Sequence, residues 1–244
     1  MSEISDIAQL THYLKRHFVA LGELAALGGV VEARVIALIE ARAIPGPIYS
    51  LWPNGAFSSP IGGSHAGPPS GTPIHWYAPA AAWWVRRAQA LSPNACACAF
   101  ETHFVNDFVT RLAAEPAGHL GYPQVYLAGT FDPAAATLAA RSEWQDWLDG
   151  GYGVCLRHAD AYHAITKTCR RAEVLAMTDH GQMPTLSEAQ MGKLLTVMEE
   201  LDSVMLPFAP HQRPHGTPGL WIDSILARYG LGRTRELAAS PLLP

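Results

Sequence analysis

The chain has 244 residues, of which 49% are hydrophobic and 16% charged, and it is long enough to bury a substantial core. The net charge of −4 and the pI near 6.2 offer no broad cationic surface, which argues against nucleic acid as a partner. No segment approaches the ~20 apolar residues of a membrane helix, no signal-like start is present, and four cysteines with two in ACACA suit reduced thiols, so we expect no membrane partner and a cytoplasmic protein.

Residues 1–48 are predicted to form a helical subdomain. Apolar residues at helical spacing begin at Ile7 and Leu10, the segment GELAALGG follows, and VEARVIALIEARA carries a second apolar face. These helices end in IPGPIY, because Pro45 and Pro47 cannot continue a helix. Two helices around a glycine-containing turn resemble a helix-turn-helix.

Residues 49–79 are predicted to form a loop or lid. Between Pro45 and Pro79 the chain carries 8 of its 19 prolines and 6 of its 21 glycines, a composition that disfavours regular structure. A mobile segment of this length beside a site would be suited to closing over it and excluding water.

Residues 80–244 are predicted to form the main helical domain. Its helices include APAAAWWVRRAQAL, the run PNACACAFETHFVNDFVTRL and DAYHAITKTCRRAEVLAM, with QVYLAG and YGVCL as short strands. Asp132 is the expected N-cap of a helix that begins at Pro133 and ends before Gly150. Thr185 and Glu188 form an expected capping box, and LWIDSILARYG is a last helix. The fold class is therefore mostly α with a small β component.

The N-terminal helices raise DNA binding as an alternative function. DNA binding by the N-terminal helices would need cations on the reading helix, but Arg34 and Arg42 are accompanied by Glu32 and Glu40, which repel phosphate. A non-catalytic regulatory or DNA-binding protein is the alternative function. If the helices do not bind DNA, they would serve packing or dimer formation. We expect the protein to be a homodimer.

Metal and cofactor sites have little support in the sequence. Cys155, His158 and His163 lie close together in YGVCLRHADAYH, but their spacing does not fit the paired ligands of zinc sites. Neither GxGxxG after a strand, nor GxxxxGK[ST], nor GxSxG is present. We therefore expect no metal and no cofactor, so that any chemistry would come from side chains.

One carboxylate stands out within an apolar helical stripe. Glu101 falls between Cys98 and Val105 on one helical line, with Phe100 and Phe104 beside it. A buried carboxylate is either paired for structure or held protonated near neutral pH, and the second case suits a general acid or base. Both interpretations stay open from the residues alone. Arg87 similarly interrupts an apolar stripe beside two tryptophans.

The segments IPGPIY, HWYAPAAAWW, FETHF and WQDWLDGGYGVCLRHADAYHAITK together resemble the bacterial family that contains the McbB-like Pictet-Spengler enzymes of β-carboline alkaloid biosynthesis. The resemblance covers about residues 10–180 and contains no short diagnostic motif. It implies cofactor-independent condensation of L-tryptophan with an aldehyde or keto acid, and it assigns Glu101 as the general base. The substrate-binding residues that we expect from local pattern are Arg87, His75, Trp76, Trp84, Phe100 and Phe104.

Overall fold

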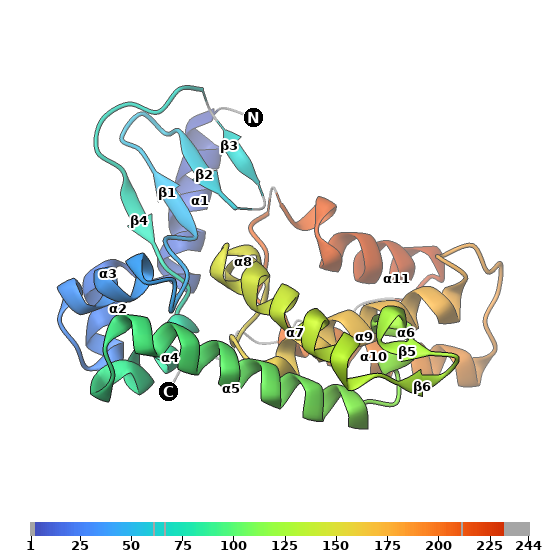
Figure 1. Ribbon diagram of the computed structural model, residues 1–244. Helices are drawn as coiled ribbons and strands as arrows, with labels where there is room; N and C mark the ends of the chain where they lie inside the picture. The colour runs from blue at the N-terminus through green and yellow to red at the C-terminus, as the bar shows by residue number, and fades with distance from the viewer. Residues whose placement is uncertain (1–2, 61, 66, 211, 232–244) are drawn as a thin grey trace.

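Helices make up most of the chain in a computed structural model, which Figure 1 shows in ribbon form. The structure describes residues 3–60, 62–65, 67–210 and 212–231. Two small antiparallel sheets accompany the helices, so the prediction of a mostly α fold with a small β component is confirmed. In the part of the chain that is described, no helix is both long and apolar enough to cross a membrane.

The N-terminal segment forms the three expected small helices, α1 (Glu3–His17), α2 (Leu21–Gly28) and α3 (Glu32–Glu40). Leu10, Leu14 and Phe18 are buried, as their helical spacing predicts. Gly29 ends α2 in the left-handed conformation, with φ of 68°, which glycine adopts without steric cost. The turn between α2 and α3 therefore has a local cause in the sequence.

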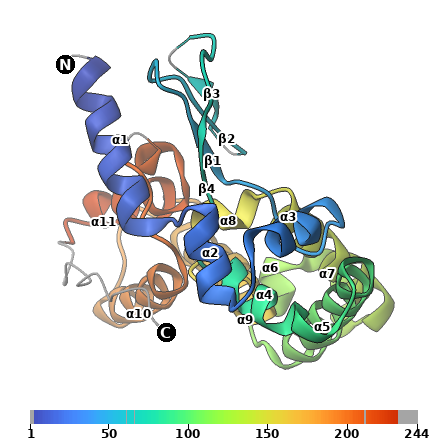
Figure 2. The same cartoon turned by 90° about the vertical axis from the view of Figure 1, so that its left-hand side faces the viewer.

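The segment at residues 49–79 contains a four-stranded sheet, so the prediction of a loop without regular structure is wrong for the residues of its strands. The strands β1 (Tyr49–Leu51), β2 (Phe57–Ser59), β3 (Gly63–His65) and β4 (Ile74–Trp76) pair antiparallel in the order β3-β2-β1-β4. The prolines and glycines lie mostly in the connections between strands, where they favour turns. In Figures 1 and 2 this sheet stands beside α1 and projects from the helical body.

The rest of the described chain is built mainly of helices, with a short hairpin before α7. The strands of the hairpin are β5 (Tyr126–Leu127) and β6 (Thr130–Phe131). The α-helices are α4 (Ala81–Arg87), α5 (Pro93–Ala114), α6 (Gly118–Gly121), α7 (Pro133–Leu148), α8 (Gly151–Cys155), α9 (Ala161–Thr178), α10 (Glu188–Val204) and α11 (Ser224–Arg228). Short 3-10 turns lie at η1 (Ala88–Ala90), η2 (Pro123–Val125) and η3 (Arg213–His215), and a π-helical turn lies at η4 (Gly219–Asp223).

Local signals predicted some of these boundaries correctly and others wrongly. The Asp132 side chain accepts from the backbone N–H groups of the first turn of α7, and Gly150 follows the helix with φ of 87°, so this helix is confirmed. YGVCL is not a strand, because residues 151–155 form α8. The capping box of α10 is formed by Ser187 and Gln190 rather than by Thr185 and Glu188.

Two hydrophobic cores hold the structure together. The larger core contains side chains from all three predicted segments, and its largest fully buried members include Trp84, Trp144 and Trp147. The helix α5 packs against both α7 and α9 around it. A second core lies between the end of α9, α10, η4 and α11, and includes Val174, Leu201 and Ile225. The domain boundaries at residues 48 and 79 remain a prediction.

A network of charges joins α9 to its neighbours. Arg170 on α9 forms ion pairs with Glu115, Glu173 and Glu200, which lie after α5, on α9 and on α10. The Arg170, Glu115 and Glu173 side chains are each less than one-fifth exposed, at 16%, 14% and 17%. Pairing three carboxylates with one guanidinium satisfies charges that would be costly to bury alone. This network fixes the position of α9, which contributes to both cavities described below.

Candidate aromatic cavity

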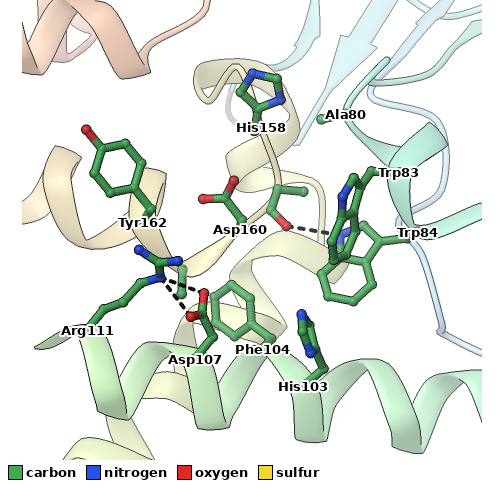
Figure 3. Close-up of a pocket in the computed structure, with 12 residues that line it drawn as sticks. Ala80, Trp83, Trp84, His103, Phe104, Asp107, Arg111, His158, Asp160 and Tyr162 are labelled. Carbon is green, nitrogen blue, oxygen red and sulfur yellow. Dashed lines mark hydrogen bonds and ion pairs between the residues drawn. The ribbon is translucent and has the colours of Figure 1, made fainter. Parts of the chain in front are cut away.

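A cavity of about 430 Å³ opens between α4, α5 and the beginning of α9 (Figure 3). We call it the aromatic cavity. Its lining residues are Ala80, Trp83, Trp84, His103, Phe104, Asp107, Arg111, His158, Ala159, Asp160, Ala161 and Tyr162. Small-molecule sites commonly enclose roughly 300–1,000 Å³, so the aromatic cavity has room for a ligand of that class.

The aromatic wall is positioned by the larger core. Trp84 is 1% exposed and its indole Nε1 donates to the backbone carbonyl of Ala159 at 3.0 Å. The ring of Trp84 lies 4.5 Å from that of Trp83, centroid to centroid, in an edge-on arrangement. Phe104 is 3% exposed and packs against Trp144, with 5.3 Å between centroids. Buried neighbours therefore hold the rings that a ligand would contact.

Polar side chains from α5 line the aromatic cavity next to the aromatic wall. His103, Asp107 and Arg111 recur every four residues, so they project from one face of the helix, as Figure 3 shows. The Nε of Arg111 donates to both carboxylate oxygens of Asp107, at 2.8 and 2.7 Å. No hydrogen bond joins the Nη groups of Arg111 to any part of the chain that the structure describes, which leaves them available to a ligand carboxylate.

The segment before α9 brings a second carboxylate to the aromatic cavity. Asp160 is the N-cap of α9, and one of its oxygens accepts from the backbone N–H and from Nδ1 of His163, at 2.9 and 2.8 Å. Burial would raise the pKa of Asp160, but the hydrogen bond and charge of His163 outweigh it and hold the pKa below its ordinary value. Asp160 is therefore ionised at neutral pH.

His158 stands at the rim of the aromatic cavity beside these groups. Partial burial lowers the pKa of His158, and the neighbouring His163 acts in the same direction, whereas Asp160 opposes both. The two imidazole rings lie 4.7 Å apart, centroid to centroid. A pKa below its ordinary value of 6.5 leaves His158 neutral at pH 7 and able to accept a proton.

Only two of the expected substrate-binding residues line the aromatic cavity. Trp84 and Phe104 do so, and Phe100 lies behind Trp84 in the core, with 4.9 Å between centroids. Arg87 lies outside, where its guanidinium stacks on the Trp83 ring at 3.5 Å from the centroid.

The other two expected residues lie on β4 and not at the aromatic cavity. Exposed His75 makes a hydrogen bond with Ser50, and Trp76 is buried in the larger core. The expectation that all these residues share one pocket is therefore wrong.

Glu101 is not buried, contrary to the prediction from its apolar stripe. Its side chain is 38% exposed, and one oxygen lies 3.5 Å from Nε of Arg141 on α7. The buried face of α5 follows the neighbouring strip that includes Phe100, Phe104 and Phe108, so Glu101 lies at its edge. Glu101 does not line the aromatic cavity. A carboxylate exposed to this extent is not the buried group that the sequence led us to expect.

The three residues of zinc-ligand type in the sequence, Cys155, His158 and His163, have other contacts. Cys155 is buried and accepts a hydrogen bond from Nζ of Lys167 at 2.9 Å, whereas His163 is bound to Asp160. Across the described ranges, no group of three or more histidine, cysteine, aspartate or glutamate side chains is arranged to hold a metal ion. All four cysteines are free thiols.

Comparison with known proteins gives one match. The model of DUF6058, a family of unknown function, matches residues 100–230, a range that contains the α5 and α9 sides of the aromatic cavity but not the two tryptophans of α4. No curated protein and no solved structure matches the chain. The family match spans more than half of the sequence, and the chain therefore belongs to DUF6058, the family of unknown function.

Proposed function

We propose that this protein is a cofactor-independent Pictet-Spengler enzyme that condenses L-tryptophan with an aldehyde or keto acid to give a β-carboline scaffold for natural-product biosynthesis. The observation that carries the proposal is the aromatic cavity, where aromatic side chains, an arginine with unused donors and an ionised carboxylate face one space. The resemblance of the sequence to Pictet-Spengler enzymes supports the same reaction.

The aromatic cavity offers a complementary group for each part of tryptophan. The indole would lie against Trp83 and Phe104, because aromatic rings favour offset or edge-on packing. The carboxylate would accept from the Nη groups of Arg111, whose Nε is already fixed by Asp107. The ammonium would bind the oxygen of Asp160 that does not contact His163. These three contacts would fix the orientation of the amino acid.

The reaction then requires proton transfers at defined points. The ammonium of tryptophan loses a proton, and its amine adds to the carbonyl carbon. The proton returns to the hydroxyl group of this adduct, which leaves as water and yields the iminium. The indole carbon attacks the iminium carbon, and loss of the ring proton restores aromaticity. In our proposal neutral His158 accepts this proton, because it faces the aromatic cavity and its pKa is lowered.

The resemblance and the geometry differ on the proton acceptor. The resemblance assigns this role to Glu101, whereas Glu101 lies outside the aromatic cavity beside Arg141. The variants His158→Gln and Glu101→Gln separate the two assignments, since each removes one proton acceptor at similar size. Loss of a general base costs about 100- to 10,000-fold in turnover. We expect this loss of turnover for His158→Gln and not for Glu101→Gln.

The regulatory alternative gains no support from the contacts of its cations. Arg34 donates from Nη2 to the backbone carbonyl of Ala88 at 2.7 Å, and Arg42 pairs with Asp149 at 2.8 Å. Both arginines of the proposed reading helix are thus engaged within the chain, and a phosphate would have to compete with these partners. A homodimer and a cytoplasmic location remain part of our proposal, the latter because all four thiols are free.

The experiment that tests the proposal is product formation by the purified chain. The protein is incubated with L-tryptophan and an α-oxoaldehyde, and formation of the tetrahydro-β-carboline is followed by liquid chromatography and mass spectrometry. We expect a product with the mass of both substrates minus one water, formed faster than without protein and unaffected by a chelator. A folded protein that leaves the rate at the level of the buffer would refute the proposed function.

A further inference from the structure

A second cavity, of about 380 Å³, lies between α6, α7, α8 and α9. We call it the polar cavity, because nearly all its lining side chains carry oxygen or nitrogen. These residues are Gly121, Tyr122, Gln124, Glu143, Asp146, Tyr152, Lys167, Thr168 and Arg171. None of them lines the aromatic cavity, and none has a role in the proposed condensation. All of them lie within the range that matches the family.

Glu143 on α7 is the most enclosed carboxylate of the polar cavity. One of its oxygens accepts from the hydroxyl of Tyr122 at 2.8 Å, and the other accepts from the hydroxyl of Tyr152. These tyrosines come from opposite sides, one after α6 and one on α8. Two neutral donors hold the carboxyl group in place without neutralising it.

Two cations on α9 face the same space. Lys167 and Arg171 are four residues apart, so both project from one face of the helix. The Nζ of Lys167 donates to the thiol of Cys155, which is a weak acceptor, and lies 5.1 Å from the centre of the Tyr152 ring. Neither cation forms an ion pair with any residue that the structure describes.

The close approach of α6 to α9 shapes one side of the polar cavity. A Cβ atom at Gly121 would stand 2.7 Å from Sγ of Cys169 and 3.0 Å from its Cα, so only glycine fits without displacing the backbone. Four charged side chains thus line the polar cavity without forming ion pairs with one another, namely Glu143, Asp146, Lys167 and Arg171. This arrangement leaves their charges available to a ligand.

We propose that the polar cavity is a binding site for a small molecule that carries a carboxylate or phosphate group, with Lys167 and Arg171 as its charge partners and the enclosed Glu143 beside them. Lys and Arg both bind such oxoanions, Arg through a planar fork of donors and Lys as a point charge. Gln124 adds a neutral donor to the same space, whereas the hydroxyl of Thr168 hydrogen-bonds with Tyr122.

The electrostatics of Glu143 couple this binding to pH. Burial raises the pKa of Glu143 to about 7, and the Asp146 carboxylate acts in the same direction, whereas the Tyr122 hydrogen bond and the charges of Lys167 and Arg171 oppose it. A bound anion would raise the pKa further, because it adds negative charge nearby. The complex would therefore hold Glu143 protonated, and binding would take up a proton near neutral pH.

The test is calorimetric titration of the full chain with propionate and, separately, with methyl phosphate, at pH 6 and pH 8 and constant ionic strength in NaCl. The anion that binds more tightly identifies the group that the polar cavity accepts. Propionate keeps its charge over this range, so protonation of a group with a pKa near 7 should make propionate binding about tenfold tighter at pH 6 than at pH 8. Titrations in two buffers of different ionisation enthalpy should report net proton uptake in the wild-type protein.

Three variants sharpen the test. Arg171→Gln, at an exposed position that folding tolerates, should weaken binding about tenfold or more. Lys193→Gln removes a charge from the exposed surface of α10 and serves as the matched control, with unchanged affinity expected. Glu143→Gln keeps a donor at the site and should bind with a pH dependence no greater than that of the ligand itself.

Several results would overturn the proposal. One is that neither anion shows saturable binding beyond that of added NaCl. Another is that Arg171→Gln binds as the wild type does, or that Lys193→Gln loses as much affinity, since the effect would then reflect surface charge. Absence of proton uptake would exclude Glu143 from the site. Each of these results is independent of whether the chain turns over tryptophan.

Discussion

Glu143→Gln should stabilise the protein at alkaline pH and have little effect in acid. In the folded protein the Glu143 carboxyl is buried, with a pKa of about 7 against an ordinary value of 4.5. Between these two values the folded chain holds a proton that the unfolded chain has lost. The free energy of unfolding therefore falls as the pH rises through this window, and the loss is complete above pH 7.

The size of the effect follows from the two pKa values. A pKa raised from 4.5 to about 7 corresponds to a loss of about 3 kcal/mol in the free energy of unfolding once the group is ionised. The amide of the variant does not ionise, and its oxygen still accepts from one of the two tyrosines. The stability difference, variant minus wild type, should thus grow by about 2–3 kcal/mol between pH 5 and pH 8.

Urea unfolding of both proteins at pH 5, 6, 7 and 8 measures this difference, because all other titrating groups are shared and cancel. Glu199→Gln, which removes a carboxylate from the exposed surface of α10, is the control and should change stability by less than about 0.5 kcal/mol. A stability difference for Glu143→Gln that stays constant from pH 5 to pH 8 would refute the electrostatic description of Glu143, and with it the proton coupling of the polar cavity.

Three further predictions address the aromatic cavity and the fold. Glu101→Gln should lower the free energy of unfolding by no more than about 1 kcal/mol, because its ion pair with Arg141 is exposed. Its turnover should stay within a few fold of the wild-type value. A 100-fold loss of turnover would identify Glu101 as the general base. Arg111→Gln should weaken binding of L-tryptophan more than binding of tryptamine, which lacks the carboxylate. The control variant Arg87→Gln should weaken binding of both ligands equally. Equal losses for Arg111→Gln would show that Arg111 is structural. Asp132→Ala should cost about 1 kcal/mol in urea unfolding through loss of the α7 cap, and unchanged stability would contradict this.

The sequence predicted those elements whose signals are local. Asp132, Pro133 and Gly150 specify the ends of α7 within the helix itself, and the structure has the expected cap and left-handed turn. The four-stranded sheet was missed because its strands are three residues long and their stability comes from pairing with distant segments. YGVCL contains strand-like residues but is too short for its periodicity to separate strand from helix.

The candidate site was predictable only in part, for the same reason. Trp84 and Phe104 were predicted, whereas the four-residue spacing of His103, Asp107 and Arg111 was overlooked, and nothing local indicates that Asp160 faces them. Glu143 was missed because the two tyrosines that enclose it come from separate elements. The buried carboxylate with a raised pKa that was expected at Glu101 is thus found at Glu143.

The most direct test of the central claim, that the aromatic cavity binds tryptophan, is a crystal structure of the protein soaked with L-tryptophan. We predict that the indole lies against Trp83 and Phe104, with its carboxylate on the Nη groups of Arg111 and its ammonium on Asp160. An empty aromatic cavity in crystals that hold tryptophan elsewhere, beside Glu101 for example, would contradict the claim and move the proposed chemistry to that place.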